Sequence, residues 1–175
     1  MAKKKAKGKR STLNRAAKKK MFQEIDIKHY LGEKPTAKQK KVFADLAIDE
    51  IRSRTLQNED INGKKFIKYD KKYAKQKGVS VNDVNLFLKG KLLDSIGRRK
   101  SNEKVSTVFL QMKKGKETLK AFNHNTGDKL KKREFFGITD EEARKIAQRI
   151  KDEEPDKKTL KELRESFAGE FSDGE

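Results

Sequence analysis

One stretch of the chain, from Thr36 to Leu56, limits the possible folds more than any other. Its apolar residues recur three and four positions apart, as on one face of an α-helix, and its other face is strongly charged. Thr36 followed by Gln39 predicts a capping box at the amino end. A helix of this length crosses a small domain, so we expect the core to form against its apolar face. That face consists of Val42, Phe43, Leu46, Ala47 and Ile51.

The apolar residues of the chain are sufficient for one modest core. Of the 175 residues, 33% are hydrophobic and 42% are charged, which excludes a large multidomain enzyme. No segment approaches the roughly 20 consecutive apolar residues of a membrane span. The amino-terminal segment also lacks the apolar centre of a signal peptide. We therefore expect a soluble protein, intracellular when it is made, with no membrane partner.

The chain offers few groups for metal or redox chemistry. It contains no Cys, which removes disulfides, zinc ribbons, iron–sulfur ligation and thiol nucleophiles. Its two imidazoles, His29 and His124, are too far apart in sequence to form a paired metal-ligand motif. The sequence has no phosphate-binding loop, no GxSxG turn and no HExxH motif. We predict that the protein uses no cofactor and no metal, and that it is not an enzyme.

Positive charge is concentrated at the amino terminus. Residues 1–20 contain 10 Lys and Arg and no acid, within a chain whose formal net charge is +19. Such a run has too little apolar surface to fold alone, so residues 1–35 are predicted to form a basic arm. The arm is expected to contact an acidic protein surface, with DNA as the alternative. The candidate contacts are Lys3, Lys4, Lys5, Lys7, Lys9, Arg10, Lys18, Lys19 and Lys20.

The middle of the chain, residues 36–152, predicts a small α+β domain in which an antiparallel sheet packs with the long helix and with further helices. The clearest strand, Lys104–Met112, is rich in β-branched and aromatic residues, and its two faces alternate along the chain. One face carries Ser106, Val108, Leu110 and Met112, and the other carries Val105, Thr107 and Phe109. Thr139 with Glu142 forms a second capping box at the start of another helix, which the spacing of its apolar residues predicts to pack on one side. These residues are Ala143, Ile146, Ala147 and Ile150. An acidic helical tail, residues 153–175, follows the domain.

Two more helical segments are predicted between the long helix and the strand. The first covers residues 66–78 and ends at Gly78. The second ends at Gly97 and is followed by a basic loop at 98–100. Their apolar residues are expected in the core, and they are Phe66, Tyr69, Tyr73, Leu92, Leu93 and Ile96.

Two groups of residues allow a second interpretation. His124 lies in a run of hydrogen-bonding residues that could bind a ligand, although holding a turn is the favoured role. Phe135 and Phe136, next to Arg133, could stack on nucleic-acid bases, although packing in the core is favoured. No helix-turn-helix, zinc-finger or aromatic RNA-binding signature accompanies them.

Three segments follow one another in a fixed order: FIKYDKKYAKQKG with LFLKGKLLDSI, then AFNHNTGD, then KREFFGIT. Their order and spacing over residues 36–152 resemble the virion morphogenesis, or tail-completion, family of Mu-like and other tailed phages. The sequence departs from the family at Lys89, usually a small hydroxyl residue, and at Lys132, frequently Pro. The motif residues for which the resemblance implies structural roles are Tyr69, Tyr73, Gly90, Leu92, Leu93, Ile96, His124, Gly127, Arg133, Phe135, Phe136 and Gly137.

The resemblance implies a non-enzymatic component of the phage neck. Such proteins are small α+β subunits that assemble as a ring between the portal side and the tail. It implies a homo-oligomeric ring, a dodecamer rather than a hexamer, that contacts a portal-side or head-completion protein, a tail-side protein and, transiently, DNA. The protein would assemble in the host cytoplasm and reside in the virion at the head–tail interface. The residues alone leave one alternative open, a basic nucleic-acid-binding protein of the ribosomal or DNA-packaging type.

Overall fold

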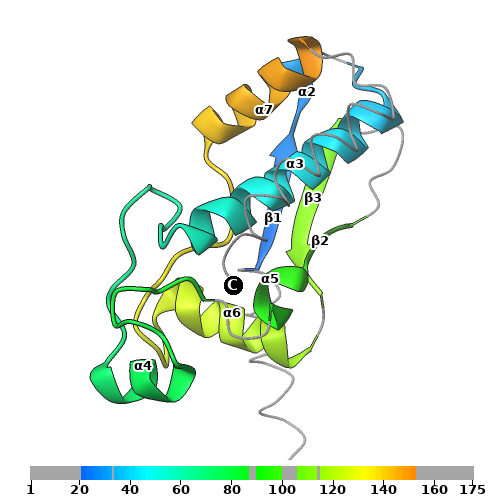
Figure 1. Ribbon diagram of the computed structural model, residues 1–175. Helices are drawn as coiled ribbons and strands as arrows, with labels where there is room; N and C mark the ends of the chain where they lie inside the picture. Colours follow the sequence, from blue (N-terminus) through cyan, green and yellow to red (C-terminus); the bar gives the residue numbers. More distant parts are fainter. Residues whose placement is uncertain (1–20, 33, 87–89, 100–105, 114, 153–175) are drawn as a thin grey trace, which may run out of the picture.

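Figure 1 shows the computed structural model, which describes residues 21–32, 34–86, 90–99, 106–113 and 115–152. In this part the chain forms a three-stranded antiparallel sheet together with several helices, which confirms the predicted α+β class. None of the described helices is both long and apolar enough to cross a membrane.

The long helix α3 spans Ala37–Leu56, as the sequence predicts. The Thr36 hydroxyl accepts a hydrogen bond from the Gln39 backbone N–H at 3.1 Å. The Gln39 side-chain oxygen accepts one from the Thr36 N–H at 2.8 Å, which completes the predicted capping box. The apolar face of α3 is buried against the sheet on one side and against helix α7, Asp140–Asp152, on the other.

Helix α7 also begins at a predicted capping box. The Thr139 N–H donates to the Glu142 carboxylate at 2.7 Å, and the Glu142 N–H donates to the Thr139 hydroxyl at 3.2 Å. A short helix, α2 (Lys28–Leu31), packs against α7, and the Tyr30 hydroxyl donates to Asp140 at 2.6 Å. The residues that α7 buries are those expected from the spacing of its apolar positions, and they are Ala143, Ile146, Ala147 and Ile150.

The sheet has the order β1–β3–β2, and both pairs of neighbours are antiparallel. Its central strand β3, Thr107–Met112, lies within the strand predicted from the sequence. Strands β1, Phe22–Asp26, and β2, Ile96–Arg99, form the two edges. Helix α3 packs on one face of the sheet (Figure 1). The apolar side chains that β3 directs into the core are Val108, Leu110 and Met112.

The two edge strands correct the sequence prediction. Strand β1 lies within residues 1–35, which the sequence predicts to be an arm. Met21, directly before this strand, is only 1% exposed, so the folded domain includes residues from Met21 onward. Arg98 and Arg99, predicted in a loop, belong to strand β2. Each edge strand is too short for its own sequence pattern to identify it. Its hydrogen bonds come from pairing with β3, which is distant in sequence, so no local signal predicts it.

Helix α4, Lys71–Lys77, is shorter than predicted. It ends at Gly78, where φ is 75°, as expected, but it begins after Tyr69 because Asp70 caps it. The Asp70 carboxylate accepts a hydrogen bond from the Tyr73 N–H at 2.8 Å. Tyr69 is buried as predicted, whereas Tyr73 is 44% exposed, so its expected place in the core is wrong.

Two further helices complete the described fold. Helix α5, Lys91–Asp94, places Leu92 and Leu93 in the core. Ile96, predicted on the same helix, is also buried but begins strand β2. Helix α6, Lys116–Thr126, follows β3 and lies next to α5.

Candidate functional site

The motif residues fall into two groups in the structure. One group lies in or beside α5 and β2, where it contributes to the core. The other comes from three separate segments that meet at the end of the domain carrying α4 (Figure 1). The first group is Gly90, Leu92, Leu93 and Ile96, and the second is Tyr69, Tyr73, His124, Gly127, Arg133, Phe135, Phe136 and Gly137.

Arg133 connects the three segments of the second group. Its backbone N–H donates to the carbonyl of His124 at 2.7 Å. Its guanidinium donates to the carbonyl of Ile67 from Nη2 at 2.9 Å and from Nε at 3.2 Å. The same guanidinium lies 5.0 Å from the centre of the Tyr69 ring, a cation–π distance. Arg133 is only 5% exposed, so its first role is to hold this end of the fold together.

Lys77 adds a second cation beside Tyr69. Its ammonium donates to the Tyr69 hydroxyl at 3.0 Å and to the Asn85 side chain at 3.0 Å, and lies 4.8 Å from the Tyr69 ring centre. Burial lowers the pKa of the His124 imidazole, and the charges of Arg133 and Lys77 add to this effect, so that together they bring it from 6.5 to about 4. The imidazole is therefore neutral near pH 7, and its buried Nδ1 has no hydrogen-bond partner among the described residues.

The sequence favours a turn around His124, but the structure corrects this, because the segment is helical up to Thr126 and only Gly127 leaves the helical conformation. His124 lies in the last turn of α6, which ends at Gly127 with φ of 74°. The side-chain oxygen of Asn125 accepts hydrogen bonds from the backbone N–H groups of Phe135 and Phe136, both at 3.0 Å. The only local signal for Asn125 is its place beside His124 in a run of hydrogen-bonding residues.

Phe135 and Phe136 are core residues. Their exposed fractions are 0% and 5%, so the interpretation favoured from the sequence is confirmed and the folded domain does not present them for stacking. Gly137 follows them with φ of 115°, and an added Cβ would lie 3.1 Å from Ile61 and 3.3 Å from Gln23. The backbone here needs glycine both for its conformation and for its close packing.

Strand β1 is tied to this segment by one side chain. The Gln23 amide donates to the carbonyl of Ile138 at 2.8 Å, and its oxygen accepts from the Ile138 N–H at 2.9 Å. This pair of hydrogen bonds joins residues far apart in the sequence, so no local pattern identifies Gln23 as important.

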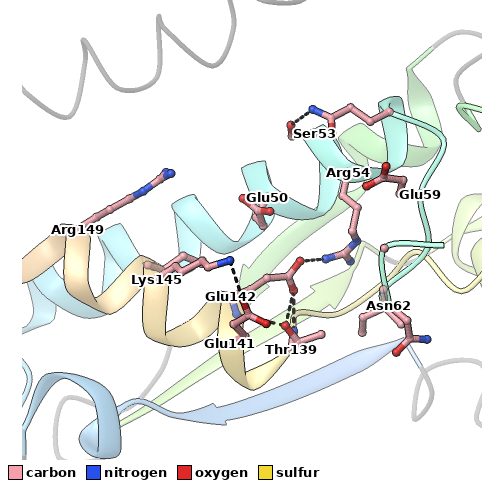
Figure 2. Close-up of a pocket in the computed structure, with 14 residues that line it drawn as sticks. Glu50, Ser53, Arg54, Glu59, Asn62, Thr139, Glu141, Glu142, Lys145 and Arg149 are labelled. Atoms are coloured by element: carbon pink, nitrogen blue, oxygen red, sulfur yellow. Dashed lines mark hydrogen bonds and ion pairs between the residues drawn. The ribbon is translucent and has the colours of Figure 1, made fainter. Parts of the chain in front are cut away.

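Arg54 reaches the same segment from α3 (Figure 2). Its Nη2 donates to the carbonyls of Phe135 at 3.0 Å and Gly137 at 2.7 Å, and its Nη1 pairs with the Glu142 carboxylate. Arg54 is only 6% exposed, so this basic side chain near the carboxyl end of α3 is buried rather than solvated. The overlooked signal is its spacing, three residues after Ile51 on the apolar face of α3.

A cavity of about 640 Å³ lies beside this ion pair, between α3, α7 and the loop at 57–63 (Figure 2). Side chains of both charges line it, and several are paired, as Glu141 is with Lys145 at 2.7 Å. In the described ranges no group of three or more His, Asp or Glu could hold a metal ion. The acids of residues 140–142 lie in the first turn of α7, where they complement the helix dipole.

The face of the sheet opposite to the core carries a second candidate site. Phe22 and Phe109 stack there with ring centres 5.5 Å apart, and both are only half-buried. The strand register places Glu24 of β1 and Arg99 of β2 on either side of Phe109 in one row across the sheet. Glu24 and Arg99 are exposed. The row therefore has an acidic end at one edge and a basic end at the other.

The candidate contacts of the basic arm, from Lys3 to Lys20, and the predicted tail at 153–175 lie outside the residues that the structure describes.

No protein-family model matches the chain, and no curated protein or solved structure matches it.

Proposed function

We propose that this protein is a structural component of the neck of a tailed phage, where it forms a ring of identical subunits that joins the DNA-filled head to the tail. In this proposal it acts without catalysis or cofactor, and it resides in the virion after assembly in the host cytoplasm. Its neighbours are a portal-side or head-completion protein and a tail-side protein. The order of the three sequence segments supports this family, and from the same resemblance we favour a dodecamer over a hexamer.

The observation that supports a ring is the row Glu24, Phe109 and Arg99. A closed ring requires two different, complementary patches on each subunit, because the contacts run head to tail. The two edges of this sheet differ in that way, since β1 presents an acid and β2 a base on the same face. Opposite charges brought together would favour one pairing of edges and disfavour contact between two like edges.

The backbone geometry is compatible with the same contact. Strands β1 and β2 both run antiparallel to β3, so they point in the same direction. In a head-to-tail contact, β2 of a second copy would therefore lie beside β1 of the first copy and parallel to it. The two strands would extend the sheet through main-chain hydrogen bonds. This arrangement would bring Glu24 of one subunit near Arg99 of the next.

A charge-swap experiment tests this arrangement. The mass of the purified full chain, measured by light scattering and by negative-stain imaging, should correspond to a ring. Glu24→Arg and Arg99→Glu should each reduce ring formation, because each places like charges at the contact. The double variant should recover it. Glu141→Arg, which changes the same charge at an exposed site on α7, is the matched control.

Two outcomes would contradict the proposal. One is a wild-type protein that remains monomeric even with the other neck proteins present. The other is a double variant that assembles no better than either single variant while all variants keep the wild-type melting temperature.

A further inference from the structure

Lysines are concentrated on the surface formed by residues 64–77 and 128–132, here called the α4 face. Residues 64–77 contain seven Lys and one acid, and residues 128–132 contain three Lys and one acid. The two segments lie side by side, since the Lys131 ammonium donates to the carbonyl of Lys68 at 3.4 Å. Arg133, directly after the second segment, binds the carbonyl of Ile67 in the first. The lysines of both segments therefore share one surface.

Most of these charges form no ion pair with the residues that the structure describes. Asp70 is used to cap α4, and among the described residues only Lys65 and Lys132 are in ion pairs, with Glu59 and Glu134. The remaining exposed lysines of the face have no ion pair within the described residues, and they are Lys64, Lys68, Lys71, Lys72, Lys75, Lys129 and Lys131.

Apolar side chains lie between the lysines. Ile67 is 52% exposed, and Tyr73 and Leu130 are each 44% exposed. The Tyr73 ring is held by an edge contact with Tyr69, with ring centres 4.9 Å apart. A nucleic-acid backbone alternates charged phosphates with less polar sugars, so a surface that mixes lysines with apolar groups suits it.

Positive groups also accumulate beneath the face. Arg133 and Lys77 both lie against Tyr69, and each lowers the pKa of the neighbouring His124 after the larger effect of burial. Like charges held this close reduce the stability of the folded state. An arrangement that the fold maintains against this repulsion is expected to serve a polyanionic partner.

We propose that the α4 face binds the phosphate backbone of duplex DNA without reading its base sequence. Duplex DNA is favoured over an acidic protein because it offers regularly repeated phosphates to many point charges at once, and the unpaired cations here are all lysines. This inference deepens the proposed function. It rests on that function in one respect, namely that the bound DNA is the phage genome.

Two variants of the full chain test the proposal. Lys71→Gln, Lys72→Gln and Lys75→Gln together remove three charges from the α4 face. Lys34→Gln, Lys38→Gln and Lys41→Gln remove three exposed charges at the start of α3, at the opposite end of the domain (Figure 1). Both variants keep the basic arm, so any difference between them comes from the position of the lost charges.

The measurement is the affinity for a short fluorescent DNA duplex over a range of salt concentrations. Each lost phosphate contact should make the slope of log K, where K is the association constant, against log salt concentration shallower by about 0.9. The slope of the α4 variant should therefore be shallower than that of the wild type by about 2 to 3. At low salt its affinity should fall on the order of tenfold or more, and the control should stay near wild type. Replacing the three lysines by Arg should preserve binding, because the charge remains.

Equal DNA binding by wild type and both variants would overturn the inference, since the arm alone would then account for binding. An α4 variant that keeps its DNA affinity but no longer assembles or joins heads to tails would also overturn it, because the face would then contact protein. The mass of the same samples separates the two proposals. A monomer that binds DNA through the α4 face would leave this inference standing and contradict the ring.

Discussion

The two ends of this domain are held together in different ways. Around the sheet, α3 and α7, apolar side chains repeat along each element and bury one another, so many contacts each contribute a little. At the end that carries α4, the chain is largely irregular, and single polar side chains satisfy several backbone groups each. Arg54, Asn125, Arg133 and Gln23 are the clearest examples. Irregular backbone cannot satisfy its own hydrogen-bonding groups, so a few side chains must do so.

This difference predicts that stability at the α4 end depends on a few residues. The largest effect is expected for Arg54→Met, which leaves the Glu142 carboxylate without its partner and the carbonyls of Phe135 and Gly137 without a donor. We expect a loss of about 3 to 5 kcal/mol in the free energy of unfolding, measured by urea denaturation.

The matched control is Arg144→Met, which breaks an exposed ion pair with Asp140 on α7 and should leave the free energy of unfolding close to that of the wild type, because water already screens these charges. Similar losses in the free energy of unfolding in both variants would show that the buried Arg54 contributes no more to stability than an exposed arginine. The contrast between the two ends would then not hold.

The second effect concerns pH. The folded-state pKa of His124 is about 4, below its ordinary value of 6.5, so between these values the unfolded chain binds a proton that the folded chain does not. The stability associated with His124 is therefore fully present above pH 6.5 and is lost as the pH falls toward 4. Between pH 7 and pH 5 this should reduce the free energy of unfolding by about 2 kcal/mol.

The His124→Gln variant isolates this contribution, because the carboxylates titrate alike in both proteins. Its free energy of unfolding should decrease less than that of the wild type between the same two pH values. Parallel curves for the two proteins would mean that the imidazole is not shielded from water at this end of the fold.

The smallest effect is expected at the other end of the domain. Thr36→Ala removes the hydroxyl that caps α3 and should lower the free energy of unfolding by about 1 kcal/mol. Thr36→Ser keeps the hydroxyl and should be close to wild type. A loss as large as that of Arg54→Met would show that the regular half also depends on single polar contacts.

The regular elements could be predicted because their patterns are local. Both capping boxes, the apolar faces of α3 and α7, and the alternation along β3 were read from spacing alone and are present in the structure. One residue departs from these patterns. Tyr73 fits a helical spacing but faces solvent, because the helix begins only after Asp70 caps it.

The candidate sites could be predicted only in part. The motif residues Arg133, Phe135 and Gly137 were identified from the sequence, but their partners Arg54, Gln23 and Ile67 were not. The acidic and basic edges of the sheet were also unforeseen, because β1 was assigned to the arm and Arg99 to a loop.

The α+β class, the long capped helix, the central strand and most of the core follow from local patterns in the sequence, because period, capping and alternation act within a few residues along the chain. Other features emerge only when the chain folds: which strands flank β3, which arginine is buried, and that the lysines of residues 64–77 and 128–132 share one face. These features depend on pairings between distant segments, and the free energy of such pairings comes from hydrogen bonds and burial that exist only once the segments have met.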